Sequence, residues 1–369
     1  MMTARKIMLT AGLIGITTIV GLCQNVELTG TIKCEQTREF LSNSLVRVGD
    51  YFTYSNDDGE FVLTVPKDNA KQLEIYHMGY DGYSKEIETS GKIFPFVINL
   101  NKVEPKPTGF NTGTDVMKEV FNRFHVNYEV EDQLMLAYYK ENLTANDKIY
   151  HFAEGVVEIH IPSNVEKGPA RLRPLKTRVK STADFKHGGL YDKSGHASEM
   201  IQSWAFTDFL SKKNRWSYNY RLVGKEVHRN ENVFIIDFSP MNENGYVQGR
   251  LWVDEFTYAI IRIEYNLAHE TEWDSETWVE EFQHHNHTYY LMRASFEGHW
   301  TEDGKPYVFN SMVVNTRIEA NQEDRISREK FIKGTEFTFV DQSHGSFTDD
   351  YWEGYNYIKL TAKERAQIQ

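Results

Sequence analysis

The stretch at residues 149–160, IYHFAEGVVEIH, contains an H-x-x-E pair, His151 and Glu154, of a type that supplies two ligands in zinc-dependent hydrolases. Zinc ligands must converge on one ion at roughly 2.0–2.3 Å. The stretch reads as a β-strand, whose side chains point alternately to its two faces. His151 then shares an apolar face with Ile149 and Ala153, whereas Glu154 points to the other face. This spacing therefore argues against a shared metal ion.

A second set of imidazoles lies in FQHHNHTYY, where His284, His285 and His287 crowd a short segment between two strand-like runs. Imidazole ligands suit zinc, copper or nickel. The segment has the pattern of a hairpin tip, which exposes its side chains and offers no outer partners to orient a ligand. We expect solvated turn histidines here, with weak, adventitious metal binding as the alternative.

All seven tryptophans lie between Trp204 and Trp352. Such residues can line a concave pocket for an apolar ligand or a sugar. In a β-rich chain they also form core contacts and cross-strand pairs. The candidate pocket residues are Trp252, Tyr258, Trp278, Tyr290 and Trp300.

Basic residues gather around Pro174 in a segment with little periodicity. They are Arg171, Arg173, Lys176, Arg178 and Lys180. The pattern predicts a solvated loop, with a contact for an acidic partner as the alternative.

Templates for other chemistries are missing from the sequence. It contains no G-x-S-x-G, no G-x-x-x-x-G-K and no H-E-x-x-H pattern. We expect no catalytic residues and no cofactor.

Residues 1–23 read as a secretory signal peptide. Arg5 and Lys6 precede an uncharged run at residues 7–22, and cleavage is predicted before Gln24. A membrane anchor and a lipid attached to Cys23 stay open as alternatives. We expect secretion across the inner membrane, to the periplasm or the outer membrane.

The charge balance limits the partners. The formal net charge is −12, and removal of residues 1–23 leaves 39 basic against 53 acidic residues, a net charge of −14. Nucleic-acid binding needs a positive surface, so no nucleic acid is expected. Only Cys34 would remain after cleavage, which excludes an internal disulfide.

Residues 24–102 are predicted to form a small antiparallel β-sandwich. The β-rich runs VELTGTIKC, EFVLTVP and FPFVINL are separated by turn signals such as NDDG at residues 56–59. Alternation in EFVLTVP puts Phe61 and Val65 on one face, and Pro66 ends the ladder. Residues 103–113, with Pro, Gly, Lys and Thr, are predicted to be a linker.

The order of LTGTIK, NDDGEFVLTVP, LEIYHMGY and FVINL resembles that of carboxypeptidase-like regulatory domains. The resemblance implies a transthyretin-like β-sandwich of the bacterial envelope. Such domains accompany some carboxypeptidases and carry no catalytic residues themselves. The resemblance therefore implies a folding, docking or spacing module and not peptide hydrolysis.

Residues 114–369 are predicted to form an α+β domain, in which a large curved antiparallel sheet carries a few helices. One helix is expected in TDVMKEVFNRF, capped by Thr114 or Asp115, and another at residues 198–213. Strand-like runs fill most of the remainder. The fold class is therefore mainly β.

The second domain carries resemblances of its own. AYYKEN, GRLWVDEFTYAIIRIE and YWEGYN resemble segments downstream of such regulatory domains in uncharacterised envelope proteins of Gram-negative bacteria. GRLWVDEFTYAIIRIE is also similar to the half-barrel of periplasmic lipoprotein carriers, which holds an acyl chain.

The sequence thus predicts a non-enzymatic envelope protein. It would bind a protein partner or an apolar small molecule, with peripheral association with the outer membrane as an option. Two alternatives stay open: a metal-dependent hydrolase using His151 and Glu154, and a purely structural docking module.

Overall fold

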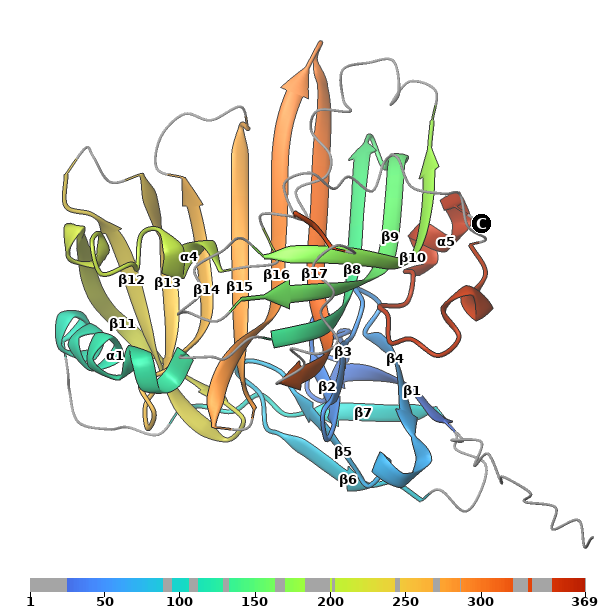
Figure 1. Cartoon of the computed structure of the whole chain (residues 1–369), viewed down its shortest axis with the longest axis horizontal. Coiled ribbons are helices and arrows are strands. Elements are labelled where there is room, and N and C mark those ends of the chain that lie inside the picture. The colour runs from blue at the N-terminus through green and yellow to red at the C-terminus, as the bar shows by residue number, and fades with distance from the viewer. Residues whose placement is uncertain are drawn as a thin grey trace, which may run out of the picture.

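The larger part of the chain is a strongly curved antiparallel sheet, shown in Figure 1. Its strand order is β11-β12-β13-β14-β15-β16-β17-β8-β9-β10, and β18 pairs with β10. The strands are β8 (Gln133–Ala145), β9 (Lys148–Ile161), β10 (Arg171–Ser181), β11 (Tyr218–His228), β12 (Glu231–Pro240), β13 (Val247–Asp254), β14 (Ile260–Leu267), β15 (Ser275–His285), β16 (Thr288–Glu302), β17 (Lys305–Ala320) and β18 (Ile332–Lys333). This half-barrel confirms the predicted fold class.

The computed structural model describes residues 25–88, 95–105, 112–128, 133–162, 170–182, 200, 203–242, 246–267, 273–285, 287–320, 331–333 and 347–368. The predicted signal peptide lies outside these residues. Among the helices in the described ranges, none is both long and apolar enough to span a bilayer.

The N-terminal part is a two-layer sandwich. One layer has the order β4-β1-β7 and the other β3-β2-β5-β6. The strands are β1 (Asn25–Cys34), β2 (Leu45–Val48), β3 (Tyr51–Tyr54), β4 (Glu60–Pro66), β5 (Gln72–Tyr76), β6 (Tyr83–Glu86) and β7 (Phe96–Leu100), with the short 3-10 helix η1 (Lys67–Asn69) after β4. Leu28, Ile32, Phe61 and Ile98 belong to its buried core.

The sandwich differs from the prediction in one strand pair. We expected an antiparallel arrangement throughout, but β1 and β7 are parallel, with Gly30 opposite Phe96. Parallel neighbours need a crossover connection, and the chain between β1 and β7 supplies it by passing through the other layer.

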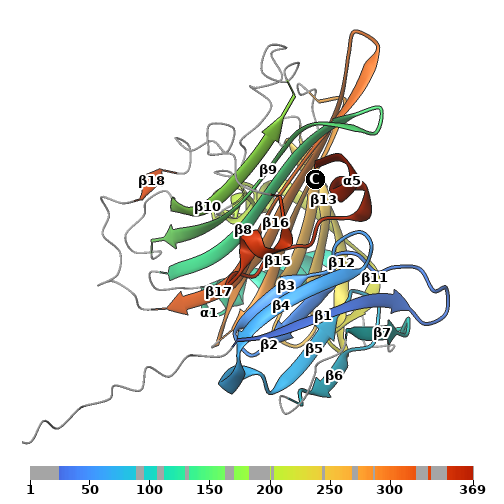
Figure 2. The same cartoon turned by 90° about the vertical axis from the view of Figure 1, so that its right-hand side faces the viewer.

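Sandwich and half-barrel are joined through hydrogen bonds. Strand β3 pairs with β17 at Tyr51 and Arg317. The C-terminal segment at residues 347–368 holds the 3-10 helix η7 (Asp349–Trp352) and the helix α5 (Ala362–Ile368). Thr53 Oγ1 donates to the carbonyl of Tyr357 at 3.1 Å. Figure 2 shows that the sandwich and this C-terminal segment lie on the same side of the large curved sheet. We call this side of the sheet the convex face. The predicted domain boundaries stay predictions.

The opposite, concave face is covered by helices. Helix α1 (Gly113–Tyr128) packs across β11 and β16 and buries Val116, Val120 and Phe121. Its first turn is capped by Thr112, whose Oγ1 accepts from the Asp115 N–H at 3.1 Å, and not by Thr114 or Asp115 as predicted.

The second predicted helix is shorter than expected. Among the described residues of 198–213, Met200 and α4 (Trp204–Thr207) are helical and Ser203 is not, and turns and the 3-10 helix η3 (Arg215–Ser217) follow α4. Phe209 packs against Phe238 at 5.1 Å and Tyr265 at 5.2 Å between ring centroids. This irregular segment therefore fills the concave face with aromatic side chains.

The basic segment around Pro174 is a strand and not the predicted loop. Strand β10 pairs with β9 along its whole length, and the register shifts between Pro174 and Lys176. This bulge breaks the alternation that would have identified Leu172 and Val179 as buried residues of one strand.

Candidate functional site

Four side chains form a row across the convex face. Trp252 of β13 lies directly opposite Arg262 of β14, Arg262 opposite Glu281 of β15, and Glu281 opposite Arg293 of β16. Directly opposed residues in an antiparallel sheet point to the same face. The register of four strands therefore builds one continuous polar and aromatic surface.

Glu281 is the electrostatic centre of this row. Its Oε2 lies 3.3 Å from Arg293 Nη1, and its Oε1 accepts from Arg262 Nη1. Burial alone would raise the pKa of Glu281, but the two guanidinium groups lower it below its ordinary value. Glu281 is thus a carboxylate at neutral pH and fixes both arginines in place.

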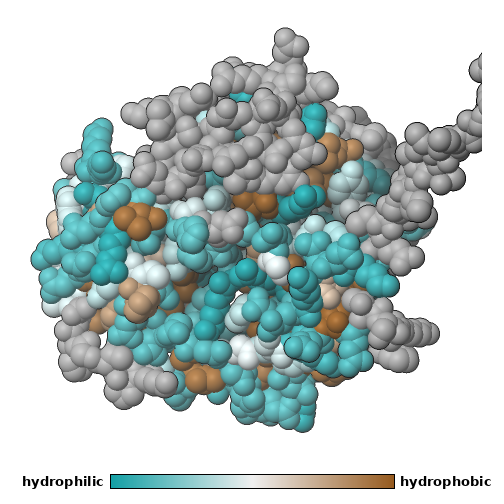
Figure 3. Space-filling model, turned by 60° about the horizontal axis from the view of Figure 1, so that its bottom comes forward, coloured by the Kyte–Doolittle hydropathy of each residue, from teal (hydrophilic) through white to brown (hydrophobic). Residues whose placement is uncertain are grey.

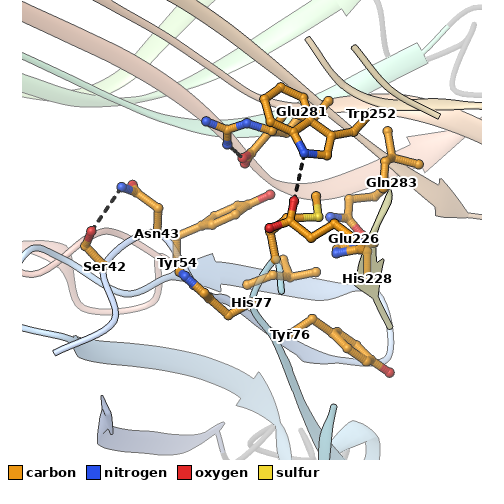
Figure 4. Close-up of a pocket in the computed structure, with 14 residues that line it drawn as sticks. Ser42, Asn43, Tyr54, Tyr76, His77, Glu226, His228, Trp252, Glu281 and Gln283 are labelled. Atoms are coloured by element: carbon orange, nitrogen blue, oxygen red, sulfur yellow. Dashed lines mark hydrogen bonds and ion pairs between the residues drawn. The ribbon is translucent and has the colours of Figure 1, made fainter. Parts of the chain in front are cut away.

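The sandwich forms the second wall of the site. The turn after β5 meets β11, where the Gly79 N–H donates to the carbonyl of Val227 at 2.8 Å. Gly79 has a φ of +81°, which glycine adopts without strain. Between the two walls lies a cavity of about 350 Å³, which we call the junction cavity (Figure 4). Its lining residues are Ser42, Asn43, Leu45, Tyr54, Tyr76, His77, Met78, Glu226, His228, Trp252, Ile261, Arg262, Glu281 and Gln283.

Two buried polar atoms in the cavity wall have unused hydrogen-bonding capacity. The Tyr54 hydroxyl and the Nδ1 of His228 are buried and make no hydrogen bond of normal geometry to a described residue, although the Gln283 amide lies near enough to the hydroxyl to oppose the rise in the pKa of Tyr54. Burial lowers the pKa of His228 to about 3, helped by the charge of Arg229, so this imidazole is neutral. Buried polar groups are nearly always paired in native proteins. Neither atom is open to the cavity, so a guest would reach them only after neighbouring side chains move.

The aromatic rings of the cavity already face cations. The guanidinium of Arg262 lies 5.2 Å from the Trp252 ring and that of Arg229 lies 4.8 Å from the Tyr76 ring. A cationic guest would meet these positive charges. An anionic guest would meet the carboxylates of Glu281 and Glu226. The Glu226 carboxylate accepts from the Trp252 indole N–H at 2.9 Å. The cavity is best matched to an uncharged molecule with hydroxyl groups and an apolar face.

The five predicted pocket residues do not share one cavity. Trp252 lines the junction cavity on the convex face. Trp278 stacks on Tyr265 on the concave face. Trp300 lies against Trp273 and Tyr307. Of the remaining two, Tyr258 sits in the β13–β14 turn beside Arg123, and Tyr290 packs against His285. The sequence could suggest aromatic candidates, but their faces depend on the register.

The H-x-x-E pair is divided between the two faces, as predicted. The His151 ring contacts Glu141 at 2.9 Å and Ser181 at 2.8 Å, whereas Glu154 pairs with Arg178. One detail is wrong: the register shifts between Leu143 and Thr144, so Ile149 packs with Phe152 and not on the His151 face. The bulge does not bring His151 and Glu154 together.

The three clustered histidines also separate. His285 is buried and not solvated as expected, because its ring meets Phe52 of the sandwich and its Nδ1 lies 3.6 Å from Asp50. His284 is exposed beside Tyr289, and His287 is exposed at the turn. Across the described residues, no group of three or more His, Cys, Asp or Glu side chains could hold a metal ion.

Metal removal is expected to leave the protein unchanged. Because His151 already has two hydrogen-bonding partners and faces away from Glu154, treatment with EDTA should not shift the melting temperature. Differential scanning fluorimetry with and without EDTA measures this. A drop in melting temperature that added zinc reverses would contradict the prediction and favour the hydrolase alternative.

The residues that sequence reasoning missed are Tyr54, His228, Arg262, Glu281 and Arg293. No motif joins them, because they come from the sandwich and from four different strands of the half-barrel. The one available signal was alternation in AIIRIE, which turns Arg262 away from Ile263 and the apolar concave face.

Neither a protein-family model nor a curated protein sequence matches the chain. Among solved structures, similarity is found to a domain from Vibrio parahaemolyticus described as an outer membrane lipoprotein-sorting protein. It is 14% identical with a TM-score of 0.31, over 59% of this chain and 97% of that one. A DUF1329 family protein from Desulfovibrio piger is 12% identical with a TM-score of 0.30, over 58% and 95%. A LolA superfamily protein from Nitrosomonas europaea is 11% identical with a TM-score of 0.25, over 61% and 100%. Identities and TM-scores this low support no conclusion about what the chain binds.

Proposed function

We propose that the chain is a non-enzymatic binding protein of the cell envelope. In this proposal the junction cavity holds a small, uncharged ligand with several hydroxyl groups, such as a sugar. Ligand sites of roughly 300–1,000 Å³ are typical for small molecules, and a cavity of about 350 Å³ falls within that range.

One observation carries the proposal: Tyr54 and His228 line the same cavity, and the Tyr54 hydroxyl and His228 Nδ1 are buried behind its surface without a hydrogen bond of normal geometry to a described residue. Leaving such a group unpaired costs about 1–3 kcal/mol. Once neighbouring side chains move aside, a ligand hydroxyl could accept from Tyr54 and donate to a neutral His228. The Trp252 ring beside them offers an apolar surface for the C–H face of a sugar.

The sequence-based expectations fit this proposal in part. The envelope location rests on the predicted signal peptide at residues 1–23, and the resemblance of residues 24–102 to regulatory domains stays a prediction. An apolar ligand or a protein partner remains the wider expectation. On the concave face such a ligand would have to displace side chains such as Phe206, which stacks on Phe282 at 4.7 Å.

The substitution Tyr54→Phe tests the proposal with two readouts. Removing an unsatisfied buried hydroxyl should raise the stability of the ligand-free protein by about 1 kcal/mol. The same change should weaken sugar binding about tenfold, because the ligand loses a hydrogen-bond donor. Urea unfolding measures the first effect, and isothermal titration calorimetry with glucose, galactose, mannose and N-acetylglucosamine measures the second.

Tyr51→Phe is the matched control, because Tyr51 lies on the same strand but does not line the cavity. It should leave sugar affinity unchanged. Equal affinities of the wild type and the Tyr54→Phe variant for every sugar that binds would contradict the assignment of the cavity.

A further inference from the structure

The junction cavity adjoins a second cavity on the same convex face. This second cavity has a volume of about 410 Å³, and Asn43 and Arg262 line both. It extends across β15, β16, β17 and β8 towards Glu364 of helix α5. The two cavities thus lie next to each other between the half-barrel, the sandwich and the C-terminal segment, and we call them together the track.

The floor of the second cavity presents small polar side chains in register. Asn142 of β8 lies directly opposite Asn310 of β17, and Asn310 lies opposite Glu297 of β16. Neighbouring strands are about 4.8 Å apart, so these amide and carboxylate groups follow one another at short, regular intervals. Ser295 and Thr277 add hydroxyl groups beside them.

The charges along the track are paired. Lys140 Nζ lies 2.5 Å from Glu364, and Glu297 lies 2.9 Å from His299 Nε2. Arg293 is held by Glu281 at 3.3 Å. Because Lys140 and Arg293 are already paired with carboxylates, a polyanion gains little by binding there, and Glu297 is the one carboxylate named here without a fixed positive partner. An uncharged chain with many hydroxyl groups costs less to desolvate than a charged chain, and the amide and carboxylate groups of the floor can replace the hydrogen bonds that its hydroxyls make to water.

The floor is the face of a sheet and not its edge. The backbone groups of β16, β17 and β8 are engaged in the ladders between them. Extended peptides are commonly recognised by adding a strand to a free edge, which this floor does not offer. Side-chain amides and hydroxyls next to an aromatic wall suit a carbohydrate better.

We infer that the ligand is an uncharged oligosaccharide, whose terminal sugar occupies the junction cavity and whose following units lie over Asn310 and Asn142 in the second cavity. This inference rests on the proposed function and deepens it, because it assigns a chain and not a single sugar to the site.

The test is a length series measured by isothermal titration calorimetry on the mature protein, residues 24–369. The probes are N-acetylglucosamine and its β-1,4-linked oligomers up to the hexamer, and glucose with the corresponding malto-oligosaccharides. We expect affinity to rise at least tenfold from the single sugar to the tetramer in one of the two series, and then to level off.

Variants separate the two cavities. The double variant Asn142→Ala/Asn310→Ala should remove most of the gain with length and leave the affinity for the single sugar unchanged. Tyr54→Phe should lower the affinity for every length by a similar factor. Asn219→Ala is the control, since Asn219 is exposed on β11 and lines neither cavity.

The outcomes distinguish the two proposals. If single sugars and oligomers bind equally well, the oligosaccharide inference is wrong while the proposed function survives. If no sugar of either series binds, both are wrong. If the uncharged peptide N-acetyl-tetra-alanine amide binds in their place, and the double asparagine variant abolishes that binding, the track recognises a peptide and the carbohydrate assignment is overturned.

Discussion

Replacing Arg178 with alanine is expected to destabilise the protein by about 3–5 kcal/mol, the cost typical of breaking a buried ion pair. Arg178 and Glu154 are almost completely buried, and the guanidinium Nε donates to Glu154 at 2.5 Å. Tyr138 also donates its hydroxyl proton to Glu154. Without Arg178 the carboxylate would remain buried with one hydrogen bond from Tyr138, and the remaining positive charge near it, that of Lys140, is already paired with Glu364.

The same substitution should loosen the C-terminal segment. The Arg178 guanidinium lies 4.9 Å from the ring centroid of Phe347, 5.4 Å from that of Tyr351 and 4.8 Å from that of Trp352. Its Nη1 donates to the carbonyl of Thr348 at 2.9 Å. Hydrogen exchange of residues 347–368 should therefore accelerate in the variant, while exchange in the distant strands of the sandwich core changes less.

Arg173→Ala is the matched control on the same strand. Arg173 pairs with Glu158 near the surface, where its side chain is 31% exposed, so we expect a loss below about 1 kcal/mol. Urea unfolding at pH 7 measures both variants. Equal losses for Arg173→Ala and Arg178→Ala would contradict the account based on burial.

The pH dependence gives the Arg178→Ala prediction a second check. Burial raises the pKa of Glu154 even though Arg178 opposes the shift, so removing Arg178 should raise this pKa further. A carboxyl group whose pKa is higher in the folded state binds its proton more tightly there, so its contribution favours folding at low pH and is lost as the pH rises through the folded pKa. The difference in the free energy of unfolding between the wild type and the Arg178→Ala variant should therefore become smaller as the pH falls from 7 towards 5.

Arg178 also illustrates where sequence reasoning stopped. The basic segment predicted a solvated loop, because a bulge hides its alternation and because its charges suggest exposure. The partners that allow burial are Glu154, on a neighbouring strand, and Trp352, far along the chain. A sequence pattern reports local periodicity, whereas the burial of a charge depends on distant partners.

The candidate site likewise depends on contacts between residues far apart in the sequence. Alternation alone separated His151 from Glu154, and it predicted a mainly β fold with a large curved sheet. It could not align Trp252, Arg262 and Glu281, because that requires the register of three strands. Nor could it place Tyr54 opposite them, since the docking of the sandwich depends on contacts such as that of Gly79 with Val227.

Replacing Glu281 with glutamine is the second substitution with a large expected effect, a loss of about 3 kcal/mol at pH 7. Glutamine keeps the shape of the side chain but leaves Arg262 and Arg293 without their shared carboxylate. Glu264→Gln is the control, because Glu264 binds the same Arg262 at 3.1 Å from a position that is 45% exposed. The Glu264→Gln variant should lose less than about 1 kcal/mol of its free energy of unfolding.

Acid titration distinguishes this account from a simple packing defect. The pKa of Glu281 lies below its ordinary value because Arg293 and Arg262 outweigh the effect of burial. A carboxyl group with a lowered folded pKa stabilises the native state above the unfolded pKa of about 4.3 and loses that contribution as the pH falls through the folded pKa. The wild type should therefore lose its advantage over Glu281→Gln below about pH 4.3. If the difference between them is the same at pH 7 and pH 3, the paired charges do not stabilise the site. The row of side chains that lines the junction cavity on the half-barrel side would then be held in place by other contacts, such as the packing of Arg262 against Trp252.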